Sequence, residues 1–395
     1  RYEQKRKSIH KKPIEFNIMS VIIKKVTSKD DLMKFIQFGI DLYKGNDYFV
    51  PPLIYDERAT LNRAKNPAFD HCDATYFLAY REDEIVGRIA AIINHKSNER
   101  WNQKHARFGF VDFIDDNDVV DSLFGAAESW SRARGMEKIH GPLGFTDLDH
   151  EGMLIEGYDR MGTMATIYNY PYYKEQIERL GYVKDKDWLE FLIQIPSEVP
   201  DRFSRMADVV KKRFGLTVKH FQKKQEIYPY AREMFILINK AYKDLYGYVE
   251  LTDKQIDYYV EMYIPMIRLE FVTLVLRQTD NKLVGVGIGL PSMSKGLRNA
   301  RGRFLPNGWY HLYKALKGNG HGGVLDLLMI AVDPEYQGKG VNALMFNEFI
   351  PAANKSGMTA AESNVELEDN SKVHSLWNGL DVEQHKRRRA YIKNL

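Results

Sequence analysis

The stretch Val332-Asp333-Pro334-Glu335-Tyr336-Gln337-Gly338-Lys339-Gly340-Val341-Asn342-Ala343-Leu344-Met345 decides how this chain is interpreted. It follows an apolar run, residues 324–332, and opens an apolar-periodic segment that reaches Ala353, which predicts the order strand, glycine-bearing loop, helix. Such an arrangement directs backbone N–H groups and the positive end of a helix at one point. The sequence therefore predicts a phosphate or pyrophosphate site, in which Lys339 adds a positive charge. An ordinary strand–turn–helix connection is the alternative.

The spacing of this loop differs from that of the commoner phosphate-binding motifs. A P-loop has the pattern G-x-x-x-x-G-K-[ST] and a dinucleotide fold G-x-G-x-x-G. The pattern here, Gln337-x-x-Gly340-x-Asn342, resembles motif A of the GCN5-related N-acetyltransferases (the GNAT superfamily), Q/R-x-x-G-x-G/A. Asn342 departs from it, because Gly or Ala is usual there. The resemblance implies that acyl-coenzyme A is the co-substrate and that its pyrophosphate is held by Gln337, Gly338, Lys339, Gly340, Val341 and Asn342.

Composition limits the classes of protein to which the chain can belong. Its 395 residues suggest two or three domains, and 44% hydrophobic with 28% charged residues fits a globular protein. A net charge of +4 is too small to imply nucleic-acid binding, so we expect no nucleic-acid partner. The single cysteine, Cys72, excludes an intrachain disulfide framework and fits a reducing, cytoplasmic setting. Cysteine and histidine show no zinc spacing, so no metal is expected. The oligomeric state stays open.

The order of expected elements predicts an α/β (α+β) fold of two GNAT-like domains in tandem. A turn at residues 195–201 separates two halves, and each shows the order strand–strand–strand–helix–strand–helix–strand. We expect residues 19–196 to form a degenerate domain and residues 197–395 the cofactor-binding domain, each a mixed, mostly antiparallel sheet flanked by helices. Residues 292–320 are an insertion in the second. Residues 1–18 are a basic arm, either disordered or upstream of the natural start.

The first half lacks a counterpart of the phosphate loop. The corresponding stretch, Ile114-Asp115-Asp116-Asn117-Asp118, carries carboxylates and no glycine. Such groups cap a helix well but repel a pyrophosphate. The first half is therefore expected either to form one wall of the substrate cleft or to contribute stability alone.

Candidate catalytic residues follow from the needs of N-acyl transfer, which are a base for the amine, polarisation of the thioester and a place for the leaving thiolate. Asp326 lies in an apolar strand eleven residues before Gln337, the spacing of the base in histone-type GNAT enzymes. Burial should raise its pKa, although a structural ion pair is the alternative. By resemblance, backbone N–H groups of Ile330, Ala331 and Val332 contact the cofactor and Asn370 touches it. Trp377 replaces the family's thiolate-protonating Tyr, so packing is the favoured interpretation of its role.

Other candidates are less specific. His321 precedes a glycine pair at the start of the key strand and is a candidate base. Asp149, His150 and Glu151, in a polar glycine-rich loop, are candidates for meeting an amine, with a solvated loop as the alternative. Trp309 and Tyr310 belong to the basic, aromatic insertion, which either lies on an anionic membrane surface or a lipid substrate, or packs as an ordinary lid. The cluster Lys386 to Arg389 is a candidate for phosphate or acidic lipid, with alternate residues solvated.

From about Val21 onward, the chain resembles a bacterial group of tandem GNAT proteins related to bacterial ceramide synthases. The matching features include Phe49-Val50-Pro51-Pro52-Leu53, Asn66-Pro67-Ala68-Phe69, His140-Gly141-Pro142 and the Gln-Gly-Lys-Gly loop. This resemblance implies an acyl-coenzyme A-dependent N-acyltransferase acting on a small-molecule or lipid amine, such as a sphingoid base, with peripheral membrane contact as an open possibility. The alternatives are a small-amine or peptide N-acetyltransferase and a non-catalytic acyl-coenzyme A sensor.

Overall fold

A computed structural model describes residues 20–318 and 323–395, so the predicted arm at residues 1–18 lies outside the described residues. The first half contains β1 (Val21–Lys25), α1 (Lys29–Asp41), α2 (Ile54–Thr60), η1 (Pro67–Asp70), β2 (Cys72–Arg81), β3 (Glu84–Asn94), α3 (His95–Arg100), β4 (His105–Phe113), α4 (Asn117–Arg132), β5 (Lys138–Gly141), β6 (Met153–Glu156), α5 (Tyr172–Arg179) and β7 (Val183–Gln194).

The second half repeats this order with an extra helix in front. It contains α6 (Asp201–Phe214), β8 (Leu216–Lys219), η2 (Lys224–Glu226), α7 (Tyr228–Tyr242), α8 (Asp253–Tyr263), η3 (Ile264–Met266), η4 (Leu269–Phe271), β9 (Val272–Arg277), β10 (Leu283–Pro291), α9 (Ser294–Ala300), α10 (Gly308–Leu316), β11 (Gly323–Val332), η5 (Pro334–Tyr336), α11 (Asn342–Lys355), β12 (Met358–Ser363), β13 (Glu366–Leu367), α12 (Ser371–His374), η6 (Ser375–Trp377) and β14 (Val382–Asn394).

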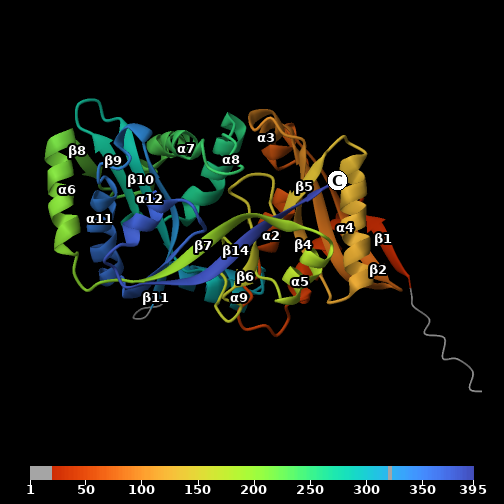
Figure 1. The fold of residues 1–395 in the computed structure, drawn as a ribbon. Helices are drawn as coiled ribbons and strands as arrows, with labels where there is room; N and C mark the ends of the chain where they lie inside the picture. The colour runs from red at the N-terminus through yellow and green to blue at the C-terminus, as the bar shows by residue number, and fades with distance from the viewer. Residues whose placement is uncertain (1–19, 319–322) are drawn as a thin grey trace, which may run out of the picture.

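One 14-stranded sheet runs through both halves in the order β1-β2-β3-β4-β5-β14-β7-β12-β11-β10-β9-β8, with β13 added to β7 and β6 to β14. The pairs β4–β5 and β11–β12 are parallel, and the other pairs are antiparallel. The predicted α/β class with mixed, mostly antiparallel sheets is therefore confirmed. The two sheets are continuous, however, rather than separate (Figure 1).

Continuity arises because the halves exchange their last strands. β7, at the end of the first half, pairs with β12 of the second half through Ala360↔Gln194. β14, at the end of the chain, pairs with β5 of the first half through Tyr391↔Gly141. The two exchanged strands also pair with each other and cross the middle of the molecule as long ribbons (Figure 1). Each half therefore completes its sheet with a strand from the other half.

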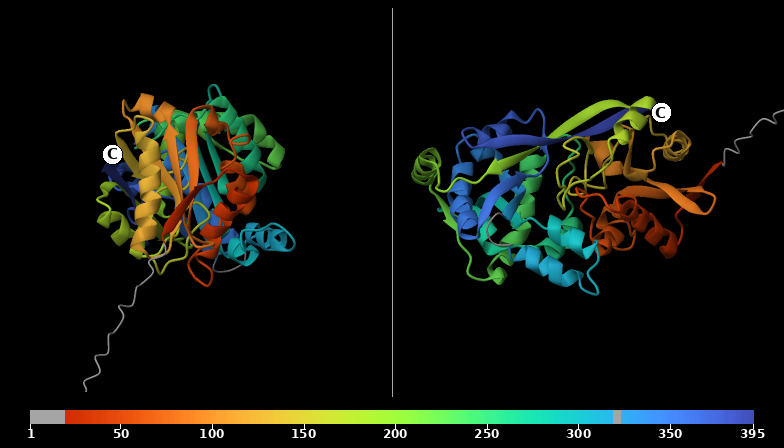
Figure 2. Two further views of the ribbon diagram at one scale, coloured as in Figure 1. Left: turned by 90° about the vertical axis from the view of Figure 1, so that its right-hand side faces the viewer. Right: turned by 90° about the horizontal axis from the view of Figure 1, so that it is seen from below.

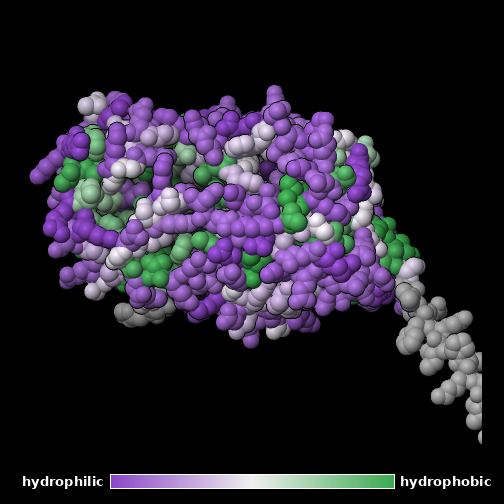
Figure 3. All heavy atoms as spheres, viewed as in Figure 1, coloured by the Kyte–Doolittle hydropathy of each residue, from purple (hydrophilic) through white to green (hydrophobic). Residues whose placement is uncertain are grey.

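Helices cover both faces of the second half. Consecutive residues of β9, Leu274 and Val275, belong to different core clusters, as expected when successive side chains of a strand lie on opposite faces. Val275 packs in the cluster that α6 and α11 complete, and Leu274 packs in that of α7 and α8. In the described part of the chain, no helix is both long and apolar enough to cross a bilayer. The face in Figure 3 is mostly hydrophilic, with small separate apolar patches.

Candidate functional site

The strand before the predicted phosphate loop separates from its parallel neighbour halfway along. β11 pairs with β12 only from Gly323 to Leu327, whereas it pairs with β10 as far as Val332. Beyond Leu327, side chains replace the missing strand: Asn364 Nδ2 donates to the Leu328 carbonyl at 3.2 Å, and the Tyr242 hydroxyl donates to the Ile330 carbonyl at 2.7 Å. This opening gives a ligand access to one edge of β11.

A cleft of about 210 Å³ lies at this opening, and we refer to it as the main cleft. Its walls come from both halves: Leu327 to Ile330 of β11, Met345, Phe346 and Phe349 of α11, Asn364 to Leu367, Asn370, Val373 and Trp377, Tyr242, Tyr246 and Tyr248, and Asp147, Leu148, Glu151 and Trp188 of the first half. The first half therefore forms one wall, as the first of its two predicted roles requires.

The loop at residues 337–341 has the features that a pyrophosphate site requires. Gly338 (φ +71°) and Gly340 (φ +82°) adopt the left-handed conformation that favours glycine. Nothing lies within 4 Å of a Cβ placed at Gly338. Among the described residues, the N–H groups of Gly338, Gly340 and Val341 donate to no other group. The loop therefore offers free donors at the N-terminus of the 14-residue helix α11.

Charge around this loop also favours an anion. Asp333, which caps η5 just before the loop, is neutralised by Lys240 and Lys282, at 3.0 and 3.2 Å. Lys339 is exposed, and its ammonium lies 5.4 Å from the Phe214 ring centroid. Asn342, which departs from the GNAT pattern, has a buried Oδ1 without a hydrogen-bond partner in the described structure. The described residues therefore fit the pyrophosphate of acyl-coenzyme A.

Glu366 is the carboxyl group of the main cleft that lies next to the strand opening. It begins β13, with two residues between it and the end of β12. Trp377 Nε1–H donates to its two carboxylate oxygens at 3.1 and 3.2 Å. Burial raises the pKa of Glu366 to about 7, although the Trp377 hydrogen bond opposes the shift. A carboxyl group with this pKa can take a proton near neutral pH.

Two further carboxyl groups enter the main cleft from the first half. Asp147 and Glu151 belong to the loop at residues 144–152, which the sequence singles out as polar and glycine-rich. Burial raises the pKa of Asp147 to about 7. Burial and the neighbouring Asp147 raise the pKa of Glu151 well above its ordinary value. Together, these groups give the first-half wall an acidic character suited to an amine.

The remaining two residues predicted in this loop face the other way. Asp149 accepts hydrogen bonds from the backbone N–H groups of Phe145 and Thr146, at 2.7 and 3.0 Å, and so fixes the loop. His150 Nε2 lies 3.0 Å from the Met164 carbonyl oxygen. Both line a second cavity rather than the main cleft, so of the predicted group only Glu151 is close to the strand opening.

Asp326 is buried behind the main cleft, among ion pairs. It is 3% exposed and does not line the main cleft. Neither carboxylate oxygen has a hydrogen-bond partner in the described structure. Burial and the nearby Glu362 raise its pKa well above the ordinary value. The raised pKa that the sequence predicts is therefore present, and the carboxyl group of Asp326 lies outside the lining of the main cleft.

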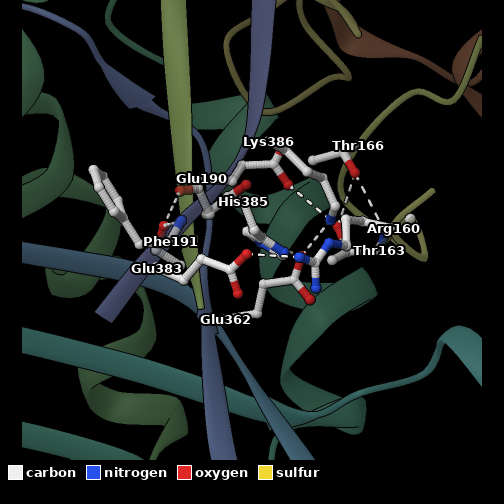
Figure 4. Close-up of polar contacts among 12 residues, drawn as sticks. Arg160, Thr163, Thr166, Glu190, Phe191, Glu362, Glu383, His385 and Lys386 are labelled. Carbon is white, nitrogen blue, oxygen red and sulfur yellow. Dashed lines mark hydrogen bonds and ion pairs between the residues drawn. The ribbon is translucent and has the colours of Figure 1, made fainter. Parts of the chain in front are cut away.

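The ion pairs near Asp326 also account for the basic cluster of β14. Lys386 binds Glu190 and Glu362, and Arg388 binds Glu190 (Figure 4). Arg387 and Arg389 bind Asp187 on the other face of the strand. The expectation that this cluster meets phosphate or lipid is therefore wrong, because carboxylates of β7 and β12 already neutralise it. Glu190, Glu362 and His385 have metal-like spacing, but Lys386 pairs with both carboxylates, and we assign the cluster to structure.

The other predicted residues are distributed as follows. Ile330 and Asn370 line the main cleft, whereas Ala331 and Val332 are buried in the core. Trp377 packs against Phe346 while it binds Glu366, which agrees with packing as its favoured role. Trp309 and Tyr310 are exposed on α10 and line neither cavity. His321 lies outside the described residues.

Sequence reasoning missed Glu366, Asp147 and Tyr246. Glu366 stands in a polar stretch with other carboxylates, Glu362, Glu368 and Asp369, so nothing in the sequence singled it out. Asp147 lies in the loop that the sequence marked, but its burial depends on the second half. Tyr246 lines the main cleft and donates its hydroxyl to Asp185, which also lies 3.3 Å from His140 Nδ1. No local pattern links these three positions.

Solved structures share this architecture. A tandem GNAT protein from the clavulanic acid biosynthesis pathway superposes with a TM-score of 0.55, over 95% of this chain and 98% of that chain, at 11% identity. The chain has the tandem GNAT fold. The glucosamine N-acetyltransferase region of a fungal multi-domain β-N-acetylglucosaminidase gives a TM-score of 0.53 over 95% of this chain and 38% of that chain, at 12% identity.

Two curated proteins are similar to this chain along most of its sequence. Protein YghO of Escherichia coli (strain K12) is 29% identical over 380 residues, 95% of each chain. A bacterial ceramide synthase of Caulobacter vibrioides (strain NA1000 / CB15N) is 27% identical over 299 residues, 75% of this chain and 76% of that protein. No family model matches the chain. The predicted resemblance to tandem GNAT proteins and bacterial ceramide synthases is therefore confirmed.

Proposed function

We propose that this protein transfers an acyl group from acyl-coenzyme A to a primary amine in the main cleft. The observation that carries the proposal is the position of Glu366, whose pKa burial raises to about 7, at the opening between β11 and β12. The free N–H groups of the loop at residues 337–341 supply the phosphate site that such a co-substrate requires. The tandem GNAT fold and the similarity to a bacterial ceramide synthase support the same chemistry.

In the proposed reaction, the amine nitrogen forms an amide C–N bond while the thioester C–S bond breaks, and coenzyme A leaves as a thiolate that takes a proton from solvent. Glu366 accepts the proton that the amine loses, which its raised pKa allows at neutral pH. In its carboxylate form, Asp147 attracts the ammonium form of the substrate into the cleft, and the ammonium loses its first proton to solvent before it attacks. Trp377 does not protonate the thiolate. Its N–H is already donated to Glu366, and an indole N–H donates hydrogen bonds but does not release its proton near neutral pH. It positions the base instead.

The substrate class that we propose is a long-chain amine, such as a sphingoid base. The similarity to a bacterial ceramide synthase motivates this choice. The insertion α9–α10, which lies at the edge of the molecule, supports it (Figure 2). Its large apolar side chains are exposed to solvent: Phe304, Leu305, Trp309, Tyr310 and Tyr313. We call these five residues the α10 patch.

Charge favours an anionic lipid surface as the partner of the α10 patch. Residues 292–318 contain no aspartate or glutamate. Five basic residues of this stretch are exposed: Lys295, Arg301, Arg303, Lys314 and Lys317. On α10 itself, Leu312 and Ala315 are buried whereas Trp309 and Tyr313 are exposed, so the helix presents aromatic rings outward. Exposed aromatic rings beside basic side chains suit the interface of an anionic bilayer. We propose peripheral contact with a membrane at this surface.

Binding of acetyl- and palmitoyl-coenzyme A, measured by calorimetry, tests the proposed co-substrate. The matched variants are Gly338→Asp and Gly338→Asn, since Asp and Asn both tolerate a positive φ and differ only in charge. Nothing lies within 4 Å of a Cβ at this position, so both side chains fit. We expect Gly338→Asp to weaken binding by about tenfold or more, and Gly338→Asn to weaken it far less. Equal effects, or no binding to the wild type, would contradict the proposal.

Turnover then separates the proposed lipid N-acyltransferase from a small-amine acetyltransferase and from a non-catalytic acyl-coenzyme A sensor. Release of free thiol is followed with palmitoyl- or acetyl-coenzyme A and either sphinganine or a short diamine. Preference for palmitoyl-coenzyme A and sphinganine supports a lipid N-acyltransferase. Preference for the acetyl donor and the small amine indicates a small-amine acetyltransferase. Binding without turnover of any pair indicates a sensor and removes the catalytic proposal.

A further inference from the structure

A second cavity, of about 190 Å³, lies in the first half against the interface with the second half. One side is formed by β4, at Phe110, Val111 and Asp112. The opposite side comes from the second half, at Met262 of α8, Met266 of η3 and Met293 before α9. The reaction proposed above uses no residue of these walls.

The second cavity is the first-half equivalent of the main cleft. β4 pairs in parallel with β5 only from His105 to Arg107, just as β11 leaves β12 after Leu327. Beyond this point the first half closes the opening with its own chain, since Leu143 N–H donates to the Phe108 carbonyl at 2.8 Å. The helix start that follows β4 is capped by Asp116, which Arg81 binds at 2.8 Å. The first half therefore excludes a phosphate ligand but keeps the cavity.

The walls of the second cavity are suited to a flexible apolar chain. Five of the chain's 14 methionines line it, and Met164, Met262 and Met266 are only partly buried. Methionine side chains are unbranched and adapt their shape to an apolar ligand. The volume exceeds the roughly 150 Å³ that holds benzene in an engineered apolar cavity. A hydrocarbon of several carbons therefore fits.

The polar residues of the second cavity require no polar ligand. Arg88 binds Glu57 at 2.9 Å and Asp112 at 2.7 Å. The Tyr43 hydroxyl donates to Asp112 at 2.7 Å. Among the described residues of this cavity, no buried side-chain nitrogen or oxygen lacks a hydrogen-bond partner. Because Arg88, Glu57, Asp112 and Tyr43 satisfy one another, an apolar occupant leaves none of these four unpaired.

The two cavities meet at one loop. Leu148 lines both of them, whereas its neighbours Asp147 and Asp149 line the main cleft and the second cavity, respectively. A substrate whose reacting end lies beside Asp147 and Glu151 therefore has an apolar space next to it, on the far side of a single side chain. This adjacency distinguishes the second cavity from an ordinary packing defect.

We propose that the second cavity binds the alkyl chain of a long-chain substrate while the reacting group of that substrate lies in the main cleft. This inference rests on the proposed function. Both the amine and the acyl group of an acyl-coenzyme A can supply such a chain, so the test has an arm for each. Acyl transfer to sphinganine needs both chains, and the second cavity holds one of them.

The test compares binding of dodecylamine with butylamine, and of lauroyl- with butyryl-coenzyme A, by calorimetry. Met266→Trp fills the cavity, and Met266→Leu keeps its volume as the matched control. In the arm whose chain uses the cavity, we expect Met266→Trp to weaken long-chain binding by about tenfold, since several methylenes lose their apolar contacts. Short-chain binding and the Met266→Leu variant stay near wild type. Unchanged long-chain binding in both arms overturns the proposal.

A second measurement uses wild-type protein and therefore does not depend on the folding of a variant. Dodecylamine and lauroyl-coenzyme A with a photoreactive diazirine at the chain end are crosslinked, and the adducts are located by mass spectrometry. Adducts on peptides that contain Met262, Met266 or Met293 support the cavity. Adducts confined to other peptides overturn it. Labelling of these peptides without turnover of any substrate pair retains this inference and removes the proposed function, so the two failures are distinguishable.

Discussion

Trp377 donates its indole N–H to both carboxylate oxygens of Glu366, at 3.1 and 3.2 Å, and thereby holds a buried acid at the opening of the main cleft. In this contact two effects on the acid oppose each other. Burial favours the protonated form, and the hydrogen bond favours the carboxylate. The balance leaves Glu366 ready to change charge near neutral pH, while the ring of Trp377 packs on Phe346.

Removing the base should remove the part of the pH dependence that belongs to Glu366. A general base acts when it is deprotonated, so we expect the rate to rise with pH through the Glu366 pKa of about 7 and then to level. Glu366→Gln should lower turnover by roughly 10²- to 10⁴-fold and remove this rise. The measurement is kcat/KM against pH for both proteins. A Glu366→Gln enzyme that keeps the wild-type profile would assign the base elsewhere.

Trp377→Phe tests the hydrogen bond separately from the carboxyl group. The ring still packs, but the donor that favours the carboxylate is lost, so the pKa of Glu366 should rise further. We therefore expect the rising limb of the pH–rate profile to move to higher pH, with a smaller loss of turnover at alkaline pH than at neutral pH. A limb that stays in place would show that Trp377 does not act through Glu366.

Asp326 should affect stability rather than turnover. Its folded-state pKa is raised, so the folded protein holds a proton that the unfolded chain releases, and stability falls as pH rises above the ordinary pKa. Asp326→Asn removes this loss. We expect the variant to retain turnover, and its advantage in free energy of unfolding over the wild type to grow with pH. Urea denaturation at acidic and alkaline pH measures the difference, and a large loss of kcat would restore Asp326 as the base.

The local parts of the fold could be predicted from the sequence because local patterns determine them. The apolar run at residues 324–332 marked β11, and the glycines marked the loop before α11. The exchange of β7 and β14 could not be predicted, since it depends on which of several similar strands pair across the molecule. Lys386 and Glu190 are 196 residues apart in sequence, so their charges gave no local sign of pairing.

The candidate site likewise has one part that the sequence could locate and one part that it could not. The backbone conformation of the loop at residues 337–341 depends on its glycines, so the sequence alone could locate this loop. The carboxyl groups of the main cleft have raised pKa values because they are buried between the two halves. This burial depends on the tertiary structure and has no local sequence pattern. Asp326 stands in an apolar run and Glu366 in a polar stretch, and only the structure shows that Glu366 lines the cleft while Asp326 is buried behind it. A carboxylate in an apolar strand therefore predicts a shifted pKa better than it predicts a catalytic role.

The buried ion pairs between the exchanged strands should be critical for stability. Arg388 is 1% exposed and binds Glu190, which lies on the neighbouring strand β7 (Figure 4 shows this Glu190 beside Lys386). Arg388→Met leaves a buried carboxylate partly unpaired, so we expect unfolding to become easier by about 3–5 kcal/mol. Arg160→Ala is the control, because its pair with Glu383 is largely exposed and contributes about 0–1 kcal/mol. Urea denaturation measures both variants, and similar losses would contradict the assignment.

The α10 patch should bind anionic vesicles. Tyr313 and Tyr228 are both 51% exposed, but only Tyr313 belongs to the α10 patch, whereas Tyr228 begins α7. Replacing a membrane-inserted ring with serine removes apolar burial, so Tyr313→Ser should weaken binding by roughly tenfold, and Tyr228→Ser should not. Cosedimentation with phosphatidylglycerol vesicles measures the effect, and phosphatidylcholine vesicles should bind less. Because the patch is flanked by basic residues and no acidic ones, added salt should also weaken binding. Equal effects of the two tyrosine substitutions would place the contact elsewhere on the surface.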